Sequence, residues 1–382
     1  MSLFLSIFLL VYSGIHLYFF LKLKAAFPLG IFLSTGLTIF LLLMVFAPIL
    51  IRILENKEME SLARFTAYAG YLWMGFIFLF FSASLFVDMY QGGLHIVALG
   101  FRRSFSSFFP GSRSTFILPL IWALAAGCYG YFEALDIRVE RVVIPTSKLP
   151  GTIKKLTIVQ ISDVHLGLIV RQERLKRIIA DINTAAPDIL VSTGDLVDGQ
   201  INRMTGMAEL LQAVRPTWGK FAVIGNHEVY AGLDQAIAFT ERAGFRILRN
   251  EGLTVGNGIA IAGVNDPSVQ KASHSDPSTE KAILSHLDPN EFRILLKHRP
   301  SLNPESTGLF DLQLSGHVHK GQIFPFNLIT RLFFPVKTGF SKLPGNAALY
   351  VSRGSGTWGP PIRLLAPPEV TVFELTRQPW KT

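Results

Sequence analysis

Apolar residues are distributed unevenly along the chain, and the first third carries long runs of them. Four stretches contain no Asp, Glu, Lys or Arg: 2–21, 25–51, 65–87 and 114–132. Each is close to the roughly 20 residues that cross the hydrocarbon core of a bilayer as a helix. These stretches also lack a polar face, which a helix in water would need. The pattern predicts a membrane domain over residues 1–135 with four transmembrane helices.

A shorter apolar run, 89–101, has thirteen residues and two adjacent glycines, so we expect it to lie in the membrane interface rather than to cross. The protein is then an integral, multi-pass membrane protein. With the amino terminus inside, six basic residues of the loops fall on the cytoplasmic side and five on the other. This division does not orient the protein, so the side of the membrane that holds the remaining chain stays undetermined.

From about residue 136 the pattern changes to short apolar runs separated by stretches of helical periodicity. Buried strands are predicted at 156–161, 188–192, 221–224, 292–296 and 312–314, and further strands at 259–264, 348–351 and 370–373. Helices are predicted at 172–184, 204–214 and 236–243. Strands that alternate with helices indicate a layered α/β domain. The fold class is thus an α-helical membrane region followed by an α/β domain.

Composition and charge indicate which kinds of molecule the protein is expected to contact. The chain is 49% hydrophobic and its formal net charge is +9, of which +3 falls in residues 1–135 and +6 in the remainder. For a domain tethered to a bilayer, anionic lipid headgroups explain a basic surface better than nucleic acid, and we expect no specific nucleic acid. No protein partner can be inferred. The single cysteine, Cys128, lies in the fourth apolar stretch, so disulfides do not hold the α/β domain.

Five of the predicted strands run into polar motifs: QISDVHLG, VSTGDLVDG, VIGNHE, LLKHRP and LSGHVHKG. The loops at the carboxyl ends of strands in α/β sheets gather in one place, where ligands bind. We therefore expect one site that contains Asp163, His165, Asp195, Asn226, His227, His298, His317 and His319.

Carboxylates, imidazoles and an amide oxygen together suit a borderline divalent metal ion. Manganese is the ion we expect, and iron, zinc and nickel fit the same donors. The number of donors is sufficient for two ions, and a pair of ions about 3.5–4 Å apart activates a water for attack on phosphorus. His317 and His319 are two residues apart, so in an extended segment both rings face the same side.

The order of the motifs, D-X-H, GDXXD, GNHE, a lone His and GHXH, resembles the calcineurin-like metallophosphoesterase superfamily over roughly residues 153–376. The segment 348–375 is similar to the closing segment of its bacterial membrane-associated, phosphodiesterase-like branch. That branch includes relatives that cleave the pyrophosphate of a UDP-diacylglucosamine lipid precursor. We assign residues 136–152 to a linker and first strand, 153–376 to the metallophosphoesterase domain and 377–382 to a tail.

The resemblance implies the role of each site residue. One metal ion would be held by Asp163, His165 and His319, with Asp195 bridging to a second ion that takes Asn226, His298 and His317. His227 would contact a phosphoryl oxygen or protonate the leaving group, which makes His227 and Asp195 the expected catalytic residues.

Four further side chains are candidates for supporting roles. Asp198 and Glu228 could orient the histidines, or they could be solvated acids. The family often has a glycine where Lys320 stands and an acidic or small residue where Arg299 stands. Both departures add positive charge, which could bind a second phosphate or point to solvent.

The apolar run 323–335 follows the GHXH motif directly and contains four phenylalanines and one charge. It could be buried under its own domain, or it could reach the membrane interface and meet an acyl chain.

The predicted function is a membrane-anchored dinuclear-metal phosphoesterase, which hydrolyses a phosphodiester or pyrophosphate of a lipid-linked or nucleotide-diphospho substrate. Two alternatives stay open. One is a non-catalytic, metal-dependent sensor of an anion or lipid, and the other is a metal-dependent nuclease. A nuclease groove should interleave basic residues with aromatic stacking platforms, and the sequence around the motifs shows no such interleaving.

Overall fold

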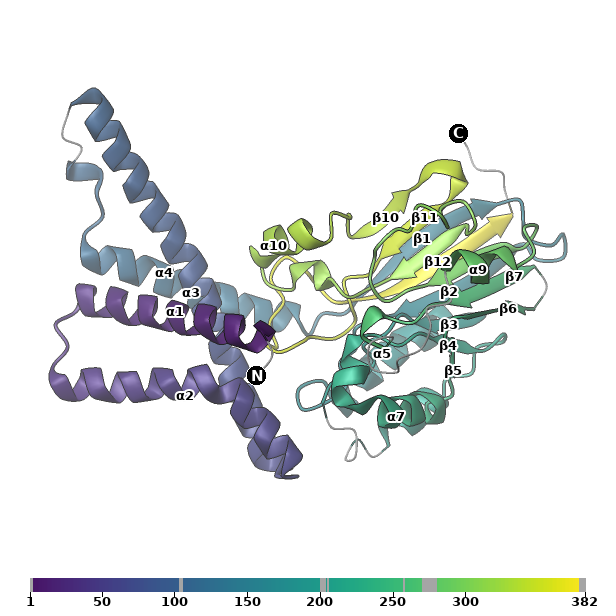
Figure 1. Ribbon diagram of the computed structural model, residues 1–382, viewed down its shortest axis with the longest axis horizontal. Helices are drawn as coiled ribbons and strands as arrows, with labels where there is room; N and C mark the ends of the chain where they lie inside the picture. Colours follow the sequence, from purple (N-terminus) through teal and green to yellow (C-terminus); the bar gives the residue numbers. More distant parts are fainter. Residues whose placement is uncertain are drawn as a thin grey trace. The chain divides into compact units, whose positions relative to one another are not determined.

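The computed structural model describes residues 3–102, 106–199, 204, 206–256, 258–269 and 280–377 (Figure 1). Its contacts divide the chain into two compact units. The helical unit runs to Phe132 and also includes Gly359–Leu364, and the α/β unit runs from Glu133 to Trp358 and resumes at Leu365. Three sequence predictions extend beyond the described residues: the first span at residue 2, the helix 204–214 at residue 205, and the tail at 378–382.

In the described residues, the helical unit has four helices that are long and apolar enough to cross a membrane. They are α1 (Leu3–Ala26), α2 (Ile31–Asn56), α3 (Glu60–Phe101) and α4 (Ser112–Glu133). Residues 89–101, which we expected to lie in the membrane interface, continue α3 without a break. Two glycines weaken a helix by about 1 kcal/mol each, which is too little to end one whose other residues are apolar helix formers.

Polar side chains join α1 to α3. Trp73 donates its indole N–H to His16 Nε2 at 2.9 Å. Further along α1, the Tyr18 hydroxyl donates to Asp88 at 2.6 Å, and Lys22 forms an ion pair with the same carboxylate. Polar groups in apolar surroundings need partners, so these pairs fix which faces of α1 and α3 meet.

The segment Gly359–Leu364 packs against α3 and α4 at two glycines. A Cβ atom at Gly75 would lie 2.7 Å from Ile362 Cδ1, and one at Gly130 would lie 2.6 Å from Ile362 Cγ2. The Arg363 N–H also donates to the Gly130 carbonyl at 2.8 Å, and Ile362 is buried. A Cβ atom at Gly130 would also lie 3.0 Å from the Arg363 carbonyl oxygen, so glycine at this position lets the segment approach the backbone of α4.

Over its described residues, the α/β unit contains two six-stranded sheets. The first has the order β1-β12-β2-β3-β4-β5, with β1 at Arg138–Thr146, β12 at Glu369–Arg377, β2 at Lys155–Ile161, β3 at Ile189–Ser192, β4 at Lys220–Ala222 and β5 at Arg246–Ile247. The second has the order β10-β11-β9-β8-β7-β6, with β10 at Gly339–Lys342, β11 at Ala348–Val351, β9 at Leu312–Ser315, β8 at Phe292–Leu296, β7 at Ile259–Gly263 and β6 at Glu251–Val255.

One apolar core fills the space between the two sheets. It includes Ile158 and Val191 of the first sheet and Ile261, Ile294 and Leu314 of the second, all buried. A second core lies between the first sheet and three helices: α5 (Gln172–Ala185), α6 (Met207–Gln212) and α7 (Asn226–Arg242). The helix α9 (Glu280–Ser285) contributes to a smaller core with β7 and β8. This confirms the layered α/β class, in which central strands are buried on both faces and so read as apolar runs.

Parallel pairing sets the position of the polar motifs. The strands β2, β3 and β4 are parallel neighbours in the first sheet, as are β7, β8 and β9 in the second. Their carboxyl ends therefore lie at one edge of each sheet, where the five motifs follow. The helix predicted at 236–243 lies in the second part of α7, which is kinked at Gly232 (φ 106°, ψ 102°), and the first part begins at Asn226, where Glu228 accepts the Gly225 N–H at 2.8 Å.

The packing of Gly359–Leu364 on α4 gives a stability prediction. Gly130→Ala should lower the melting temperature of the protein in detergent, since overpacking costs about 1–3 kcal/mol and exceeds the helix-propensity gain of about 1 kcal/mol. The matched control is Gly14→Ala in α1, where an added Cβ meets nothing within 4 Å. An equal change in melting temperature for both variants would contradict the packing.

Candidate metal centre

The predicted site residues sit in tight turns directly after the strands, and five of them have left-handed backbone. Their φ angles are 50° at Asp163, 52° at His165, 52° at Asp195, 72° at His317 and 46° at His319. Each such conformation costs about 1–3 kcal/mol for a residue with a side chain. Strain at five residues that share one place shows that the fold holds these side chains in positions that the backbone does not favour.

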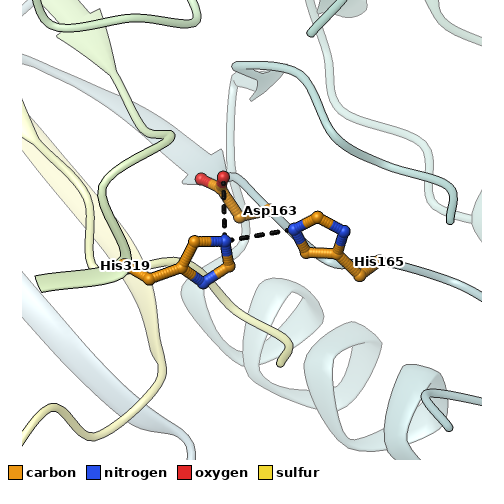
Figure 2. Close-up of side chains that lie close together, drawn as sticks. All are labelled: Asp163, His165 and His319. Atoms are coloured by element: carbon orange, nitrogen blue, oxygen red, sulfur yellow. Dashed lines mark hydrogen bonds and ion pairs between the residues drawn. The ribbon is translucent and has the colours of Figure 1, made fainter. Parts of the chain in front are cut away.

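The first cluster joins residues from the loops after β2 and β9 (Figure 2). Asp163, His165 and His319 each offer one ligand atom, and these atoms lie within 4.8 Å of one another. His165 Nε2 is 3.1 Å from His319 Nε2, which is 3.3 Å from Asp163 Oδ1. The structure thus brings together the three residues that were predicted to hold one metal ion.

The second cluster joins Asp195, His298 and His317, whose ligand atoms also lie within 4.8 Å. His298 Nε2 is 3.2 Å from His317 Nδ1 and 3.3 Å from Asn226 Oδ1. The same Nε2 atom is 3.2 Å from Asp195 Oδ2, and this oxygen is 3.8 Å from His165 Nε2 of the first cluster. One carboxylate oxygen therefore lies between the two clusters.

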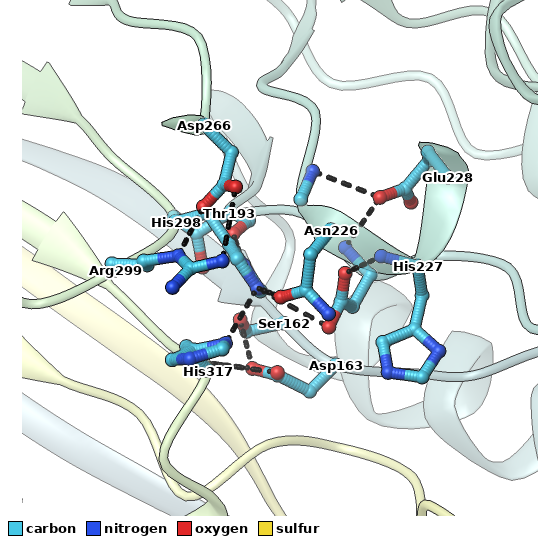
Figure 3. A network of polar contacts seen from close by, with 12 residues as sticks. Ser162, Asp163, Thr193, Asn226, His227, Glu228, Asp266, His298, Arg299 and His317 are labelled. Carbon is cyan, nitrogen blue, oxygen red and sulfur yellow. Dashed lines mark hydrogen bonds and ion pairs between the residues drawn. The ribbon is translucent and has the colours of Figure 1, made fainter. Parts of the chain in front are cut away.

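Hydrogen bonds to other atoms fix the direction of these side chains (Figure 3). His298 Nδ1 donates to the Thr193 carbonyl at 2.8 Å, which leaves Nε2 facing the cluster. The His227 backbone N–H donates to Asp195 Oδ1 at 2.8 Å, which leaves Oδ2 available. The His317 N–H lies 3.0 Å from both oxygens of Asp163.

Glu228 acts on the backbone rather than on a histidine. It accepts the N–H groups of Asp195 at 3.0 Å, Leu196 at 2.6 Å and Gly225 at 2.8 Å. This carboxylate therefore ties the turn of GDXXD to the start of α7, whereas the two roles expected from the sequence were to orient a histidine or to be a solvated acid.

Glycines in the motifs make room for the ligands. A Cβ atom at Gly225 would lie 2.2 Å from Asp195 Oδ1, and one at Gly316 would lie 2.2 Å from Asp163 Oδ2. Both carboxylates thus rest against bare backbone, which explains why GNHE and GHXH begin with glycine.

Burial sets the protonation of the two clusters. It lowers the pKa of His165 to about 4 and that of His317 to about 3, so both imidazoles are neutral at pH 7, which is the form that binds metal ions. Burial raises the pKa of Asp163 to about 6. Burial also opposes the charge on His298, but the Asp195 carboxylate outweighs it and raises the pKa of His298 to about 10.

The donor set fits two divalent ions. Imidazole nitrogens 3.1–3.2 Å apart need a proton or a metal ion between them, and both such pairs occur here with carboxylates beside them. Nitrogen and oxygen donors without a thiolate suit manganese, iron, zinc or nickel. Together with the family to which the sequence is similar, the clusters indicate a dinuclear divalent metal site.

His227 stands beside the clusters with its own partners. Its ring centroid is 4.6 Å from that of His165, and its Nδ1 is 3.0 Å from Asp198 Oδ1. Burial lowers the pKa of His227, but the carboxylates of Asp195 and Asp198 outweigh burial and raise it to about 9. The imidazolium form therefore dominates at neutral pH, and Asp198 orients its ring.

The two basic candidates differ in their surroundings. Arg299 is half-buried and pairs with Asp266, with Nε 2.7 Å from Oδ2 and Nη2 3.3 Å from Oδ1 (Figure 3). Its guanidinium is thus already engaged with a buried carboxylate, which was not among the alternatives considered from the sequence. Lys320 is exposed.

Sequence reasoning missed several neighbours of the site. The rings of Tyr230 and Trp358 lie 5.3 Å and 5.6 Å from that of His227. The side-chain amide of Gln322 holds the backbone of Trp358: its Oε1 accepts the Trp358 N–H at 2.9 Å, and its Nε2 donates to the Trp358 carbonyl at 2.8 Å. Of these residues, Asp266 could have been found from the sequence. It comes directly after the predicted strand 259–264, just as the predicted metal ligands come after their strands.

Comparison with known proteins adds relatives. A family model described as calcineurin-like phosphoesterase matches residues 156–321. A metallophosphoesterase of Aquifex aeolicus is 40% identical over 255 residues, which is 66% of this chain and 97% of the relative. One of Bacillus subtilis is 35% identical over 285 residues, covering 69% of this chain and 97% of the relative. A "transmembrane protein with metallophosphoesterase domain" of Danio rerio is 30% identical over 281 residues, covering 68% and 62%.

Solved structures are similar at lower identity. The NAD nucleotidase of Haemophilus influenzae matches with a TM-score of 0.36 and 17% identity, covering 54% of this chain and 51% of that chain. A 5'-nucleotidase precursor of Thermus thermophilus matches with a TM-score of 0.32 and 16% identity, covering 58% and 54%. The chain spans about half the length of these two proteins.

The converging donors predict stabilisation by metal. Protein stripped with a chelator should gain melting temperature when Mn²⁺ is restored, because a ligand at 100 times its Kd stabilises the folded state by about 2.7 kcal/mol. His319→Ala should reduce this gain. The matched control is His286→Ala, which removes an exposed histidine of the same unit. The assignment fails if the two variants respond to Mn²⁺ alike.

Proposed function

The chain belongs to the calcineurin-like metallophosphoesterase family, and from this premise we propose a membrane-anchored hydrolase that uses two divalent metal ions to cleave a phosphodiester or a pyrophosphate. The phosphoester-hydrolase class follows from the family. The bond type, the dinuclear mechanism and the residue roles are our proposal.

The position of Asp195 carries the proposal. Its Oδ2 atom is 3.2 Å from His298 Nε2 and 3.8 Å from His165 Nε2, so a single oxygen faces both clusters. A carboxylate placed in this way can bridge two ions, and it is held in place by the His227 N–H on its other oxygen. This geometry favours a shared, two-ion site over two separate structural sites.

We assign one ion to Asp163, His165 and His319, the second to Asn226, His298 and His317, and the bridge to Asp195. Manganese is the ion we propose. Such a pair of ions supplies a nucleophile at neutral pH and neutralises negative charge on the phosphoryl oxygens. The protein's part is to keep His165 and His317 neutral by burial and to hold five of the seven assigned ligands in strained turns.

His227 completes the proposed machinery as a proton donor. It is charged at neutral pH, is held by Asp198, and lies next to His165. A protonated imidazole in this place can hydrogen-bond a phosphoryl oxygen or give its proton to the leaving oxygen. The aromatic rings of Tyr230 and Trp358 are exposed and both contact the ring of His227. They are candidates for binding the substrate.

The helical unit makes the enzyme a membrane protein. Its four apolar helices and relatives named as transmembrane proteins support membrane association. We propose that all four helices span the bilayer, and that residues 153–376 form the catalytic domain. A substrate that is lipid-linked or a nucleotide diphosphate compound fits an enzyme in this location.

Hydrolysis separates this proposal from a non-catalytic sensor. Full-length protein with Mn²⁺ should release p-nitrophenol from bis(p-nitrophenyl) phosphate, and Asp195→Ala should abolish the release. Asp234→Ala, which removes an exposed acid of α7, should leave the rate unchanged. His227→Ala should lower kcat by about 10²–10⁴-fold on nucleotide or lipid diphosphate substrates, as loss of an acid catalyst does. Full metal occupancy without turnover on any of these esters would favour the sensor.

The pKa of His227 gives a pH prediction. The imidazolium is the active form, so activity should fall as pH rises through about 9. Removing one of the carboxylates that raise this pKa must lower it, so in Asp198→Asn the alkaline limb of the kcat profile should move to lower pH. Glu241→Gln, an exposed acid of α7, makes the same change in charge and should not move it. An unmoved limb in Asp198→Asn would exclude His227 as the titrating acid.

A further inference from the structure

The helix α10 (Phe326–Phe333) exposes its apolar side chains and covers its polar ones, which is the reverse of a helix on the surface of a water-soluble domain. Its polar residues Asn327 and Thr330 are half-buried, whereas its apolar side chains are exposed. Leu332 is 81% and Phe333 is 75% exposed. The exposed apolar set is Phe326, Leu328, Ile329, Leu332 and Phe333, with Phe324 just before the helix. A continuous apolar patch of this kind indicates a surface that meets an apolar environment.

The charges around α10 are of one sign. Between Lys320 and Lys342 the chain has four basic residues and no acidic residue. Lys320, Arg331, Lys337 and Lys342 are all exposed. An apolar helix face flanked by basic side chains matches the layer of a bilayer where acyl chains meet anionic headgroups.

Both ends of this segment are fastened beside predicted metal ligands. At its start, the Asn327 backbone lies against Gly321, where an added Cβ would be 2.4 Å from it, and Gly321 follows His319 by two residues. At its end, the Phe334 ring lies 5.1 Å from the His317 ring. The position of α10 is thus set by the same loop that carries two of the ligands.

We propose that α10 is an interfacial helix, which lays its apolar face into the surface of an anionic bilayer and places the site beside phosphoesters embedded in that surface. A bilayer is the occupant because the same chain is membrane-associated. A second copy of the chain fits less well, since pairing through this face would bring two sets of basic residues together. The choice of an embedded substrate rests on the proposed hydrolase function, whereas the contact between α10 and lipid does not.

The lipid contact can be measured without any reaction. Cys128 is the single cysteine, so Cys128→Ser gives a background in which Leu332→Cys carries one polarity-sensitive fluorophore. The full-length protein is reconstituted into vesicles of phosphatidylcholine and phosphatidylglycerol. We expect a blue shift of the emission and quenching by nitroxide groups attached to the lipid. The matched control is Lys154→Cys, an exposed position before β2 and therefore at the sheet edge opposite the site.

Two results would overturn the proposal. One is emission at position 332 that is no more shifted or quenched than emission at position 154. The other is a blue shift at position 332 in detergent that grows with protein concentration and persists without lipid, since this outcome means that a second copy covers the helix.

The substrate side is tested with the same helix. Leu332→Glu places a charge on the apolar face and should lower kcat/KM for a phosphoester embedded in vesicles by tenfold or more, which corresponds to about 1.4 kcal/mol. The release of p-nitrophenol from soluble bis(p-nitrophenyl) phosphate should stay at the wild-type rate. Equal activity of variant and wild type on the embedded ester would refute delivery through α10. If the wild-type protein does not hydrolyse the soluble ester, the hydrolase proposal is refuted instead. The contact between α10 and lipid, which is measured by fluorescence, does not depend on that outcome.

Discussion

The removal of titratable side chains from water is the constraint on which the site depends. Asp163 and His298 are fully buried, and His165 and Asp195 nearly so, at the carboxyl ends of strands that belong to two different sheets. Charged groups in such a place require a partner of opposite sign. Here the acids and imidazoles partly satisfy one another, since Asp195 raises the pKa of His298 to about 10 and His298 helps to lower the pKa of Asp195. Divalent ions satisfy the remainder, so the surrounding fold can be understood as the scaffold that keeps these groups close and dry.

The scaffold uses backbone features to maintain that arrangement. Left-handed turns at five of the candidate ligands set the direction of their side chains, and glycines at 225 and 316 let carboxylates rest against the neighbouring loop. The Glu228 carboxylate links the two turns that carry Asp195 and Asn226. The strain of the turns is tolerated because two apolar cores hold the strands on which they begin. Stability of the cores and precision of the site are therefore connected.

The two units expose different kinds of side chain, as expected if the helices contact lipid and the α/β unit contacts water. Apolar side chains cover α1 to α4, and Tyr18 with Asp88 and Trp73 with His16 are polar pairs between α1 and α3. In the α/β unit most apolar side chains are buried between layers, with α10 as the clear exception. The segment Gly359–Leu364, which follows Trp358 in the chain, is part of the helical unit. Trp358, whose ring contacts that of His227, is thus the residue immediately before a segment that packs on α3 and α4.

The sequence by itself determined the four apolar helices, the layered α/β class and the order of the five motifs. These properties are local, because periodicity and residue type within some twenty residues specify a span, a strand or a turn. It also specified the donors of the candidate site, since strand ends can be recognised from the apolar runs before them. Only the tertiary structure decided which atoms meet. Asp195 Oδ2 lies between two clusters, Arg299 pairs with Asp266, and α10 turns its apolar side outward. Each of these depends on contacts between segments far apart in the chain, and no local pattern records them.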